Sequence, residues 1–214
     1  MVQVLDWRAA EDPTQLLAVV VDAVAQGQLV GMPTETVYGI AASASVPRAV
    51  ERLQVGKGRA QEKPLTLAIH SAQEALRWVP AMGLLGRRLA RRSWPGPVTL
   101  AFRGGFTGGL LECLTESVRR RVCPADTLGL RIPDHPAAQA ILAAVDAPLV
   151  LTSANRTGEP PARTADEVIE AIGAELTLIV DDGPSPLGRA STVVLVEEDS
   201  WRILREGEIG RAHV

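Results

Sequence analysis

The chain has 214 residues and a net charge of −3, with 46% hydrophobic and 22% charged residues. This composition is that of a folded globular protein, and it excludes a disordered chain and a polycation that binds nucleic acid through its overall charge. The 22 basic residues are unequally divided, because 20 are Arg and only two, Lys57 and Lys63, are Lys.

A secreted protein, a membrane protein and a zinc protein are all disfavoured by the sequence. The N-terminus lacks a basic stretch followed by an apolar one, and the longest apolar run, residues 16–24, is interrupted by Asp22 and too short to cross a bilayer. We therefore expect a cytoplasmic protein without a membrane partner. Cys113 and Cys123 form no CxxC motif, so no zinc site is predicted and metal ligands stay unassigned.

Hydrophobic periodicity, capping residues and Gly or Pro punctuation predict the elements. Helices are expected over residues 13–27, 47–55, 84–93 and 135–145, and after the capping boxes that begin at residues 71 and 164. Strands are expected over residues 28–32, 65–69, 98–102, 128–132, 148–151, 176–180, 192–196 and 201–204. Residues 104–126 resist assignment beyond a polar, helix-like piece. Because the elements mix without strict alternation, we expect an α+β (α/β-like) fold, one domain over residues 1–214 with a twisted mixed sheet flanked by helices.

Two polar segments early in the chain follow predicted elements, where α/β proteins commonly place ligand loops. Residues 33–39 offer Thr34, Glu35 and Thr36 directly after a buried strand. The alternative for these residues is a turn with locally bonded threonines. Lys57, Arg59 and Lys63 surround a Gly-bearing loop and could gather a polyphosphate, or they could be a solvated loop with an acidic neighbour.

Two further sets lie later in the chain. Ser153 and Asn155 follow a predicted strand and could hydrogen-bond a ribose or phosphate, although a cap or Asx turn is their commoner use. Arg131, Ser191 and Arg205 lie in or beside predicted strands. An arginine buried in an apolar strand needs a partner, which could be an amino-acid carboxylate or an internal Asp or Glu.

No covalent catalyst is evident. The sequence has no Gly-x-Ser-x-Gly motif, and its histidines show no pairing with a cysteine or a nucleophilic serine.

Taken together, the segments resemble the YrdC-type L-threonylcarbamoyladenylate synthases. The matching stretches appear in the family's order and span roughly residues 28–209. They are residues 33–39 (PTETVYG), 57–59 (KGR), 63–65 (KPL), 94–100 (WPGPVTL), 129–136 (GLRIPDHP), 153–155 (SAN), 158–160 (GEP), 191–194 (STVV) and 203–207 (ILREG).

The resemblance implies a YrdC-like fold with a concave ligand cleft, in the form without the further C-terminal domain of some relatives. It also implies synthesis of threonylcarbamoyl-AMP and pyrophosphate from L-threonine, bicarbonate (or CO2) and ATP. Mg2+ is expected to bridge the phosphates, and a tRNA-modifying transferase complex is expected to use the product. Direct tRNA binding is not indicated.

The resemblance also implies roles for individual residues. Lys57, Arg59 and Lys63 are expected to be catalytic and to hold the phosphates of ATP. The residues expected to contact the nucleotide as well are Thr127, Ser153, Asn155 and Arg205. Those expected to hold threonine are Thr34, Thr36, Arg131 and Ser191, with Arg131 taking the carboxylate.

Three alternatives stay open. A YciO-like paralogue tends to lack both Lys-x-Arg and Ser-x-Asn, whereas this chain has both. A noncatalytic RNA-binding module is disfavoured by the net charge and by arginines without interleaved aromatics. A carbamoyl transferase domain shares the fold but normally lies within a larger chain. Ala68 and Pro161 stand where some relatives have a His and a Ser.

Overall fold

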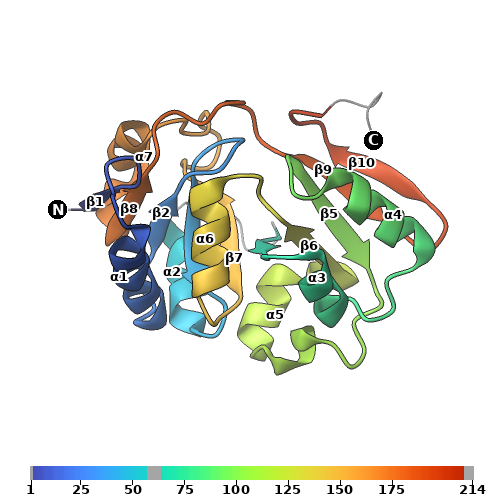
Figure 1. Ribbon diagram of the computed structural model, residues 1–214. Helices are drawn as coiled ribbons and strands as arrows, with labels where there is room; N and C mark the ends of the chain where they lie inside the picture. Colours follow the sequence, from blue (N-terminus) through green and yellow to red (C-terminus); the bar gives the residue numbers. More distant parts are fainter. Residues whose placement is uncertain (1, 57–63, 210–214) are drawn as a thin grey trace.

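The computed structural model of the protein describes residues 2–56 and 64–209 (Figure 1). Its strands form one ten-stranded sheet in the order β1-β8-β2-β3-β7-β4-β6-β5-β9-β10. The strands are β1 (Gln3–Asp6), β2 (Val30–Met32), β3 (Gly39–Ser43), β4 (Thr66–Ala68), β5 (Val98–Arg103), β6 (Thr127–Arg131), β7 (Leu149–Ser153), β8 (Leu178–Asp181), β9 (Thr192–Val196) and β10 (Trp201–Arg205).

The sheet is mixed, as the sequence predicts. The pairs β1–β8, β8–β2, β4–β6 and β5–β9 are parallel. The other neighbouring pairs, including β3–β7 and β7–β4 at the centre, are antiparallel. Parallel pairs need a crossover, and helices supply it.

The helices follow the predicted ranges closely. They are α1 (Pro13–Ala25), α2 (Pro47–Gly56), α3 (Ala72–Trp78), α4 (Leu84–Ser93), α5 (Glu116–Val122), α6 (Pro136–Ala144) and α7 (Ala165–Ile172). Side chains of Asp12, Ser71 and Thr164 cap α1, α3 and α7 as their sequence positions predict. None of the helices in the described ranges is long and apolar enough to cross a membrane.

The helices cover the two faces of the sheet unequally. Buried residues of α1 and α6 pack on one face, over β8, β2, β3 and β7, together with Ala68 of β4 (Figure 1). The other face carries a larger core, to which all the remaining helices contribute. One face is therefore sealed along its length, whereas the other is covered by helices at one end only.

Two strands were not expected from the sequence. β3 has the sequence GIAAS, without alternation or β-branched residues apart from Ile40, yet it is wholly buried because it pairs with both β2 and β7. Tertiary pairing overrides its weak propensity. β1 is a short edge strand with mostly exposed side chains, and its one pairing partner among the described strands is β8.

Candidate functional site

A cavity of about 290 Å3 opens on the same sheet face as α1 and α6, over the part of it that these two helices leave uncovered. Strands β3, β4, β5, β6, β7, β9 and β10 all contribute to it. The lining residues are Thr34, Val37, Tyr38, Gly39, Pro64, Leu65, Thr66, Thr99, Ala101, Thr127, Gly129, Arg131, Leu151, Thr152, Ser153, Ala190, Ser191, Val193, Leu204 and Arg205.

The floor of the cavity comes from the alternation of side chains along the strands. Successive residues of a strand point to opposite faces, so Thr127, Gly129 and Arg131 share one face of β6. Leu128 and Leu130 point the other way, into the larger core. Along β6, the residues that face the cavity therefore include polar ones, and the alternate residues are apolar and buried in the larger core.

Gly129 leaves space at the centre of this floor because it has no side chain. It lies opposite Ala101 on β5, and a Cβ built on it would stand 3.4 Å from Thr66 Oγ1 and 3.6 Å from Thr99 Cγ2. Neither distance is a clash, so a larger side chain would point into the cavity instead of being excluded by its neighbours. The residue type therefore sets the depth of the cavity.

One wall is the buried segment after β2. Thr34 Oγ1 donates to the carbonyl of Val37 at 2.6 Å and lies 2.9 Å from Thr36 Oγ1. The backbone N–H groups of Thr36 and Val37 both point to Thr34 Oγ1 at 3.3 Å. This is the locally bonded threonine turn that the sequence allowed, and it forms part of the cavity wall.

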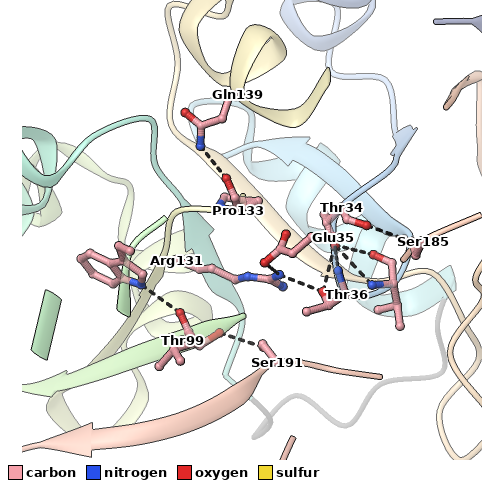
Figure 2. Close-up of polar contacts among 12 residues, drawn as sticks. Thr34, Glu35, Thr36, Thr99, Arg131, Pro133, Gln139, Ser185 and Ser191 are labelled. Carbon is pink, nitrogen blue, oxygen red and sulfur yellow. Dashed lines mark hydrogen bonds and ion pairs between the residues drawn. The ribbon is translucent and has the colours of Figure 1, made fainter. Parts of the chain in front are cut away.

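Arg131 joins this wall to the floor (Figure 2). Its Nη2 donates to Glu35 Oε1 at 2.8 Å and to Thr36 Oγ1 at 2.8 Å, and both charged side chains are only 8% exposed. Of the two partners that the sequence left open for a buried arginine, the structure has the internal carboxylate. Arg131 nevertheless also lines the cavity.

A second polar cluster lies on the opposite wall. Thr99 Oγ1 and Ser191 Oγ are 3.0 Å apart (Figure 2). Arg205 reaches over from β10 and donates through Nη2 to the Ser191 carbonyl at 2.7 Å and to Ser191 Oγ at 3.1 Å. Residues from β5, from the position just before β9 and from β10, far apart in the sequence, thus present hydroxyls and a cation to one space.

The loop after β8 fastens the first wall. Ser185 Oγ donates to the carbonyl of Thr34 at 2.9 Å, and the Leu187 N–H donates to the carbonyl of Glu35 at 3.0 Å. Tyr38 donates its hydroxyl to the Gly183 carbonyl at 2.7 Å. Burial, together with the carboxylates of the same loop, raises the pKa of Tyr38 far above its ordinary value, so the hydroxyl stays a donor.

His135 lies at the start of α6 beside the same loop. Its Nε2 is 3.5 Å from Asp182 Oδ2. Burial lowers the pKa of His135 below its ordinary value and outweighs the opposing effect of Asp182, Glu35 and Asp134. The neutral imidazole is therefore the favoured form at this position.

The predicted site residues are partly brought together. Those that line the cavity are Thr34, Thr127, Arg131, Ser153, Ser191 and Arg205. Thr36 does not line it, but its hydroxyl accepts a hydrogen bond from Arg131 Nη2. Asn155 does not line it either: its Nδ2 donates to the carbonyls of Arg156 at 2.8 Å and Glu159 at 2.7 Å, and so fixes the loop after β7. Lys57, Arg59 and Lys63 lie outside the described residues.

Several lining residues were missed by the sequence reading, namely Thr66, Thr99, Gly129 and Thr152. The first three are small or polar residues that recur with a period of two inside apolar strands. That pattern ordinarily indicates a solvent-facing strand side. Here it indicates a polar cavity floor, because the same strands lie inside the sheet and not at its edge.

The donor set of the cavity is one of hydroxyls and arginines. Across residues 2–56 and 64–209, no group of three or more His, Cys, Asp or Glu side chains is arranged to hold a metal ion. Hydroxyl and guanidinium donors suit carboxylate and phosphate oxygens. The arrangement can therefore bind an anionic ligand and orient it by several hydrogen bonds.

Comparison with known proteins identifies the family to which this chain is similar. The family model of Sua5, YciO and YrdC, described as "Telomere recombination", matches residues 22–207. A threonylcarbamoyl-AMP synthase of Bacillus subtilis is 30% identical over 214 residues, which cover all of this chain and 59% of that protein. A putative threonylcarbamoyl-AMP synthase of Mycobacterium tuberculosis is 31% identical over 215 residues and is covered to 94%.

A solved structure is also similar. Sua5 of Pyrococcus abyssi, in complex with L-threonine, superposes with a TM-score of 0.82 at 30% identity, over 97% of this chain and 57% of that one. The chain therefore spans little more than half the length of the Bacillus and Pyrococcus proteins.

Proposed function

Because this chain belongs to the Sua5, YciO and YrdC family, we propose that it is an L-threonylcarbamoyladenylate synthase. Its substrates are L-threonine, bicarbonate or CO2, and ATP, and its products are threonylcarbamoyl-AMP and pyrophosphate. The reaction makes it a nucleotidyltransferase. A second group of enzymes then passes the threonylcarbamoyl group to an adenosine of tRNA, and we place all of these steps in the cytoplasm.

The observation that carries this proposal is the cavity itself. It presents Arg131 at one wall, and Ser191, Thr99 and Arg205 at the other, over a floor with a glycine at its centre. An amino acid needs a cation for its carboxylate, and a nucleotide needs donors for its ribose and phosphates. The relative that was solved with L-threonine has the same fold over nearly the whole of this chain.

We assign the threonine end to Arg131, Thr34 and Ser191, with Thr36 holding Arg131. The nucleotide end is assigned to Thr127, Ser153 and Arg205, and Asn155 shapes the loop that follows Ser153. Lys57, Arg59 and Lys63 keep the role that the sequence motif implies, as cations for the triphosphate. Mg2+ would accompany ATP and would neutralise part of the charge on its phosphates, beside the cations Lys57, Arg59 and Lys63.

The chemistry asks little of the protein beyond position and charge. The threonine amine loses a proton and attacks CO2, which forms a carbamate. A carbamate oxygen then attacks the α-phosphorus in line, and the bond to the pyrophosphate oxygen breaks. Orientation of the two substrates and stabilisation of the charge on the phosphates supply the acceleration, so no covalent nucleophile is needed.

The test measures pyrophosphate release by the purified protein with ATP, bicarbonate and labelled L-threonine. We expect release that depends on threonine, and we expect Lys57→Ala to abolish it. Lys57→Arg is also expected to be damaging, because the larger planar guanidinium cannot take the position of a compact, mobile ammonium. Arg120→Ala is the control, since Arg120 is 72% exposed and, among the described residues, its ion pair is with Glu116 within α5.

The same assay separates the alternatives. ATP binding without threonine-dependent pyrophosphate would favour a YciO-like paralogue. Tight RNA binding without ATP binding would favour a noncatalytic RNA-binding module. Equal loss in Lys57→Ala and Arg120→Ala would contradict the location of the triphosphate site.

A further inference from the structure

The ion pair between Glu35 and Arg131 is joined in an unusual way. Both side chains are 8% exposed, and a single 2.8 Å hydrogen bond links Glu35 Oε1 to Arg131 Nη2. Glu35 Oε2 and Arg131 Nε are both buried without a hydrogen-bond partner. A carboxylate and a guanidinium that serve only each other commonly form two parallel hydrogen bonds, which would use these atoms.

One nitrogen of the guanidinium therefore makes all of its hydrogen bonds with the described residues. Arg131 Nη2 donates both to Glu35 Oε1 and to Thr36 Oγ1, at 2.8 Å each (Figure 2). Nη1 has no hydrogen bond with any residue in the described ranges, although Arg131 lines the cavity. The group is held at one corner, and another corner is left for a ligand.

The holding residues are themselves fixed. The carbonyl of Glu35 accepts from the Leu187 N–H at 3.0 Å, and the carbonyl of Thr34 accepts from Ser185 Oγ at 2.9 Å. The loop after β8 thus fixes the carbonyl that precedes Glu35 and the carbonyl of Glu35 itself. A buried ion pair with unsatisfied atoms costs desolvation energy and is weak evidence for stability, so a functional role accounts better for its presence.

We propose that Glu35 is a positioning residue, which acts through Arg131 on an α-amino acid carboxylate in the cavity. It aims the guanidinium so that Nη1 faces the ligand, while Thr36 prevents rotation about the same corner. This inference rests on the proposed function for the identity of the amino acid. It goes beyond that function because it assigns to Glu35 a role in substrate affinity without contact with the substrate.

Charge and position predict opposite results for the loss of Glu35. If only charge mattered, removal of a carboxylate beside Arg131 would strengthen binding of a second carboxylate. If position matters, the freed guanidinium loses its orientation and binding weakens. The sign of the change in affinity for L-threonine therefore distinguishes the two effects.

The experiment measures L-threonine binding to the full chain by calorimetry, and KM values for threonine and ATP by pyrophosphate release. For Glu35→Ala we expect the Kd and KM for threonine to rise at least about tenfold, with the KM for ATP changed less than about twofold. Glu35→Gln keeps an acceptor oxygen at the same place, so we expect it to restore part of the affinity. Thr36→Val is expected to weaken threonine binding in the same direction.

Glu197→Gln is the matched control. Glu197 pairs with Arg103 at 2.7 Å, but this pair is half-exposed and neither residue lines the cavity. It should leave all three constants unchanged. Thermal denaturation of each variant shows whether it is folded, and if Glu35→Ala is unfolded, Glu35→Gln and Thr36→Val still decide the question.

Unchanged or tighter threonine binding in Glu35→Gln and Thr36→Val would overturn the positioning role. An equal rise of the KM values for ATP and threonine would overturn it as well, because that indicates a general disturbance of the cavity. A wild-type protein that binds threonine but releases no pyrophosphate would overturn the proposed function and leave the positioning role supported by the binding data. Absence of threonine binding by the wild type would overturn both.

Discussion

The sheet face that carries the cavity consists of two parts built from the same kind of strand. Under α1 and α6, the side chains that point toward these helices are apolar, among them Val30, Met32, Ala41 and Leu149. Farther along the sheet, the same face presents threonines, a glycine, Arg131 and other polar groups. We call these the covered part and the open part.

The difference lies in what packs against each part. In the covered part, burial of apolar surface stabilises the fold and a polar side chain would cost free energy. In the open part, several polar side chains hydrogen-bond one another and line a cavity that can be filled by a ligand. Changes in the covered part should therefore alter stability, and changes in the open part should alter activity.

Within the comparison of these two parts, the largest expected effect on activity comes from filling the floor of the open part. Gly129→Val adds a branched side chain where a Cβ meets only Thr66 Oγ1 at 3.4 Å and Thr99 Cγ2 at 3.6 Å, so the methyl groups enter the cavity. We expect kcat/KM for threonine and ATP to fall by at least about 100-fold, because the substrates are displaced from each other. Urea unfolding should show a stability close to that of the wild type.

Gly129→Ala is the graded control for this change. It adds only the Cβ, which stands at ordinary contact distances, so its loss of activity should be much smaller. The opposite result would be a Gly129→Val variant that is less stable but keeps wild-type activity per folded molecule. The floor of the open part would then behave as the covered part is expected to.

The mirror experiment removes volume from the covered part. Ile141 on α6 is 1% exposed and packs in the covered cluster. Ile141→Ala should lower the free energy of unfolding by about 2–4 kcal/mol, through lost burial and the cavity left behind. Both KM values should stay within about twofold of the wild type under conditions where the variant is folded.

Val19→Ala on α1 serves as its control, since Val19 is 39% exposed. Its stability should change by less than about 0.5 kcal/mol. A selective rise of one KM in Ile141→Ala would show that the covered part shapes the site, contrary to the division made above.

The two parts also differ in how far the sequence predicts them. The covered part follows from periodicity: the spacing in α1 and the apolar strands β2, β7 and β8 were all expected. β3 was not expected, because its Gly and Ala residues carry no strand pattern and only pairing with β2 and β7 makes it a strand.

The open part was predicted as separate residues and not as an arrangement. Thr34, Arg131, Ser191 and Arg205 were expected in a ligand site, and all four line the cavity. That Glu35 is the partner of Arg131 could not be predicted, because 96 positions separate the two in the chain and two acceptors, internal or bound, satisfied the same rule. The pairing depends on the strand order that brings the end of β6 near the segment after β2 and on the loop after β8, which a single sequence does not specify.

A smaller effect is expected from the second polar cluster of the open part. Thr99→Val keeps the shape of the side chain but removes the hydroxyl that lies 3.0 Å from Ser191 Oγ. Ser191 keeps its hydrogen bond from Arg205, so the loss of stability should be about 1 kcal/mol. Thr115→Val, which removes an exposed hydroxyl 3.2 Å from Ser117 Oγ, should change stability less and leave both KM values unaltered.

A rise in the KM for threonine is expected for Thr99→Val, whereas Thr115→Val should show none. We expect the rise to be about threefold to fivefold, since one hydrogen bond orients Ser191 on the cavity wall. Equal kinetics in the two variants would mean that the hydroxyl of Thr99 serves only the fold, as a residue of the covered part would.

The smallest effect concerns the boundary between the two parts, where His135 at the start of α6 faces Asp182 of the loop after β8. Burial lowers the pKa of His135 in the folded protein, so below the ordinary value of 6.5 the unfolded chain binds a proton that the folded chain does not. Stability contributed by the neutral imidazole is therefore complete above pH 6.5 and is lost as the pH falls below it. At about pH 6 the loss is less than about 1 kcal/mol, because only part of the unfolded population is protonated there.

His135→Gln should remove this part of the acid limb in urea unfolding measured between pH 8 and pH 5.5, while kinetics at pH 8 stay as in the wild type. A steeper acid limb in the variant would mean that the pair with Asp182 outweighs burial, and that a charged His135 stabilises the junction of the covered and open parts.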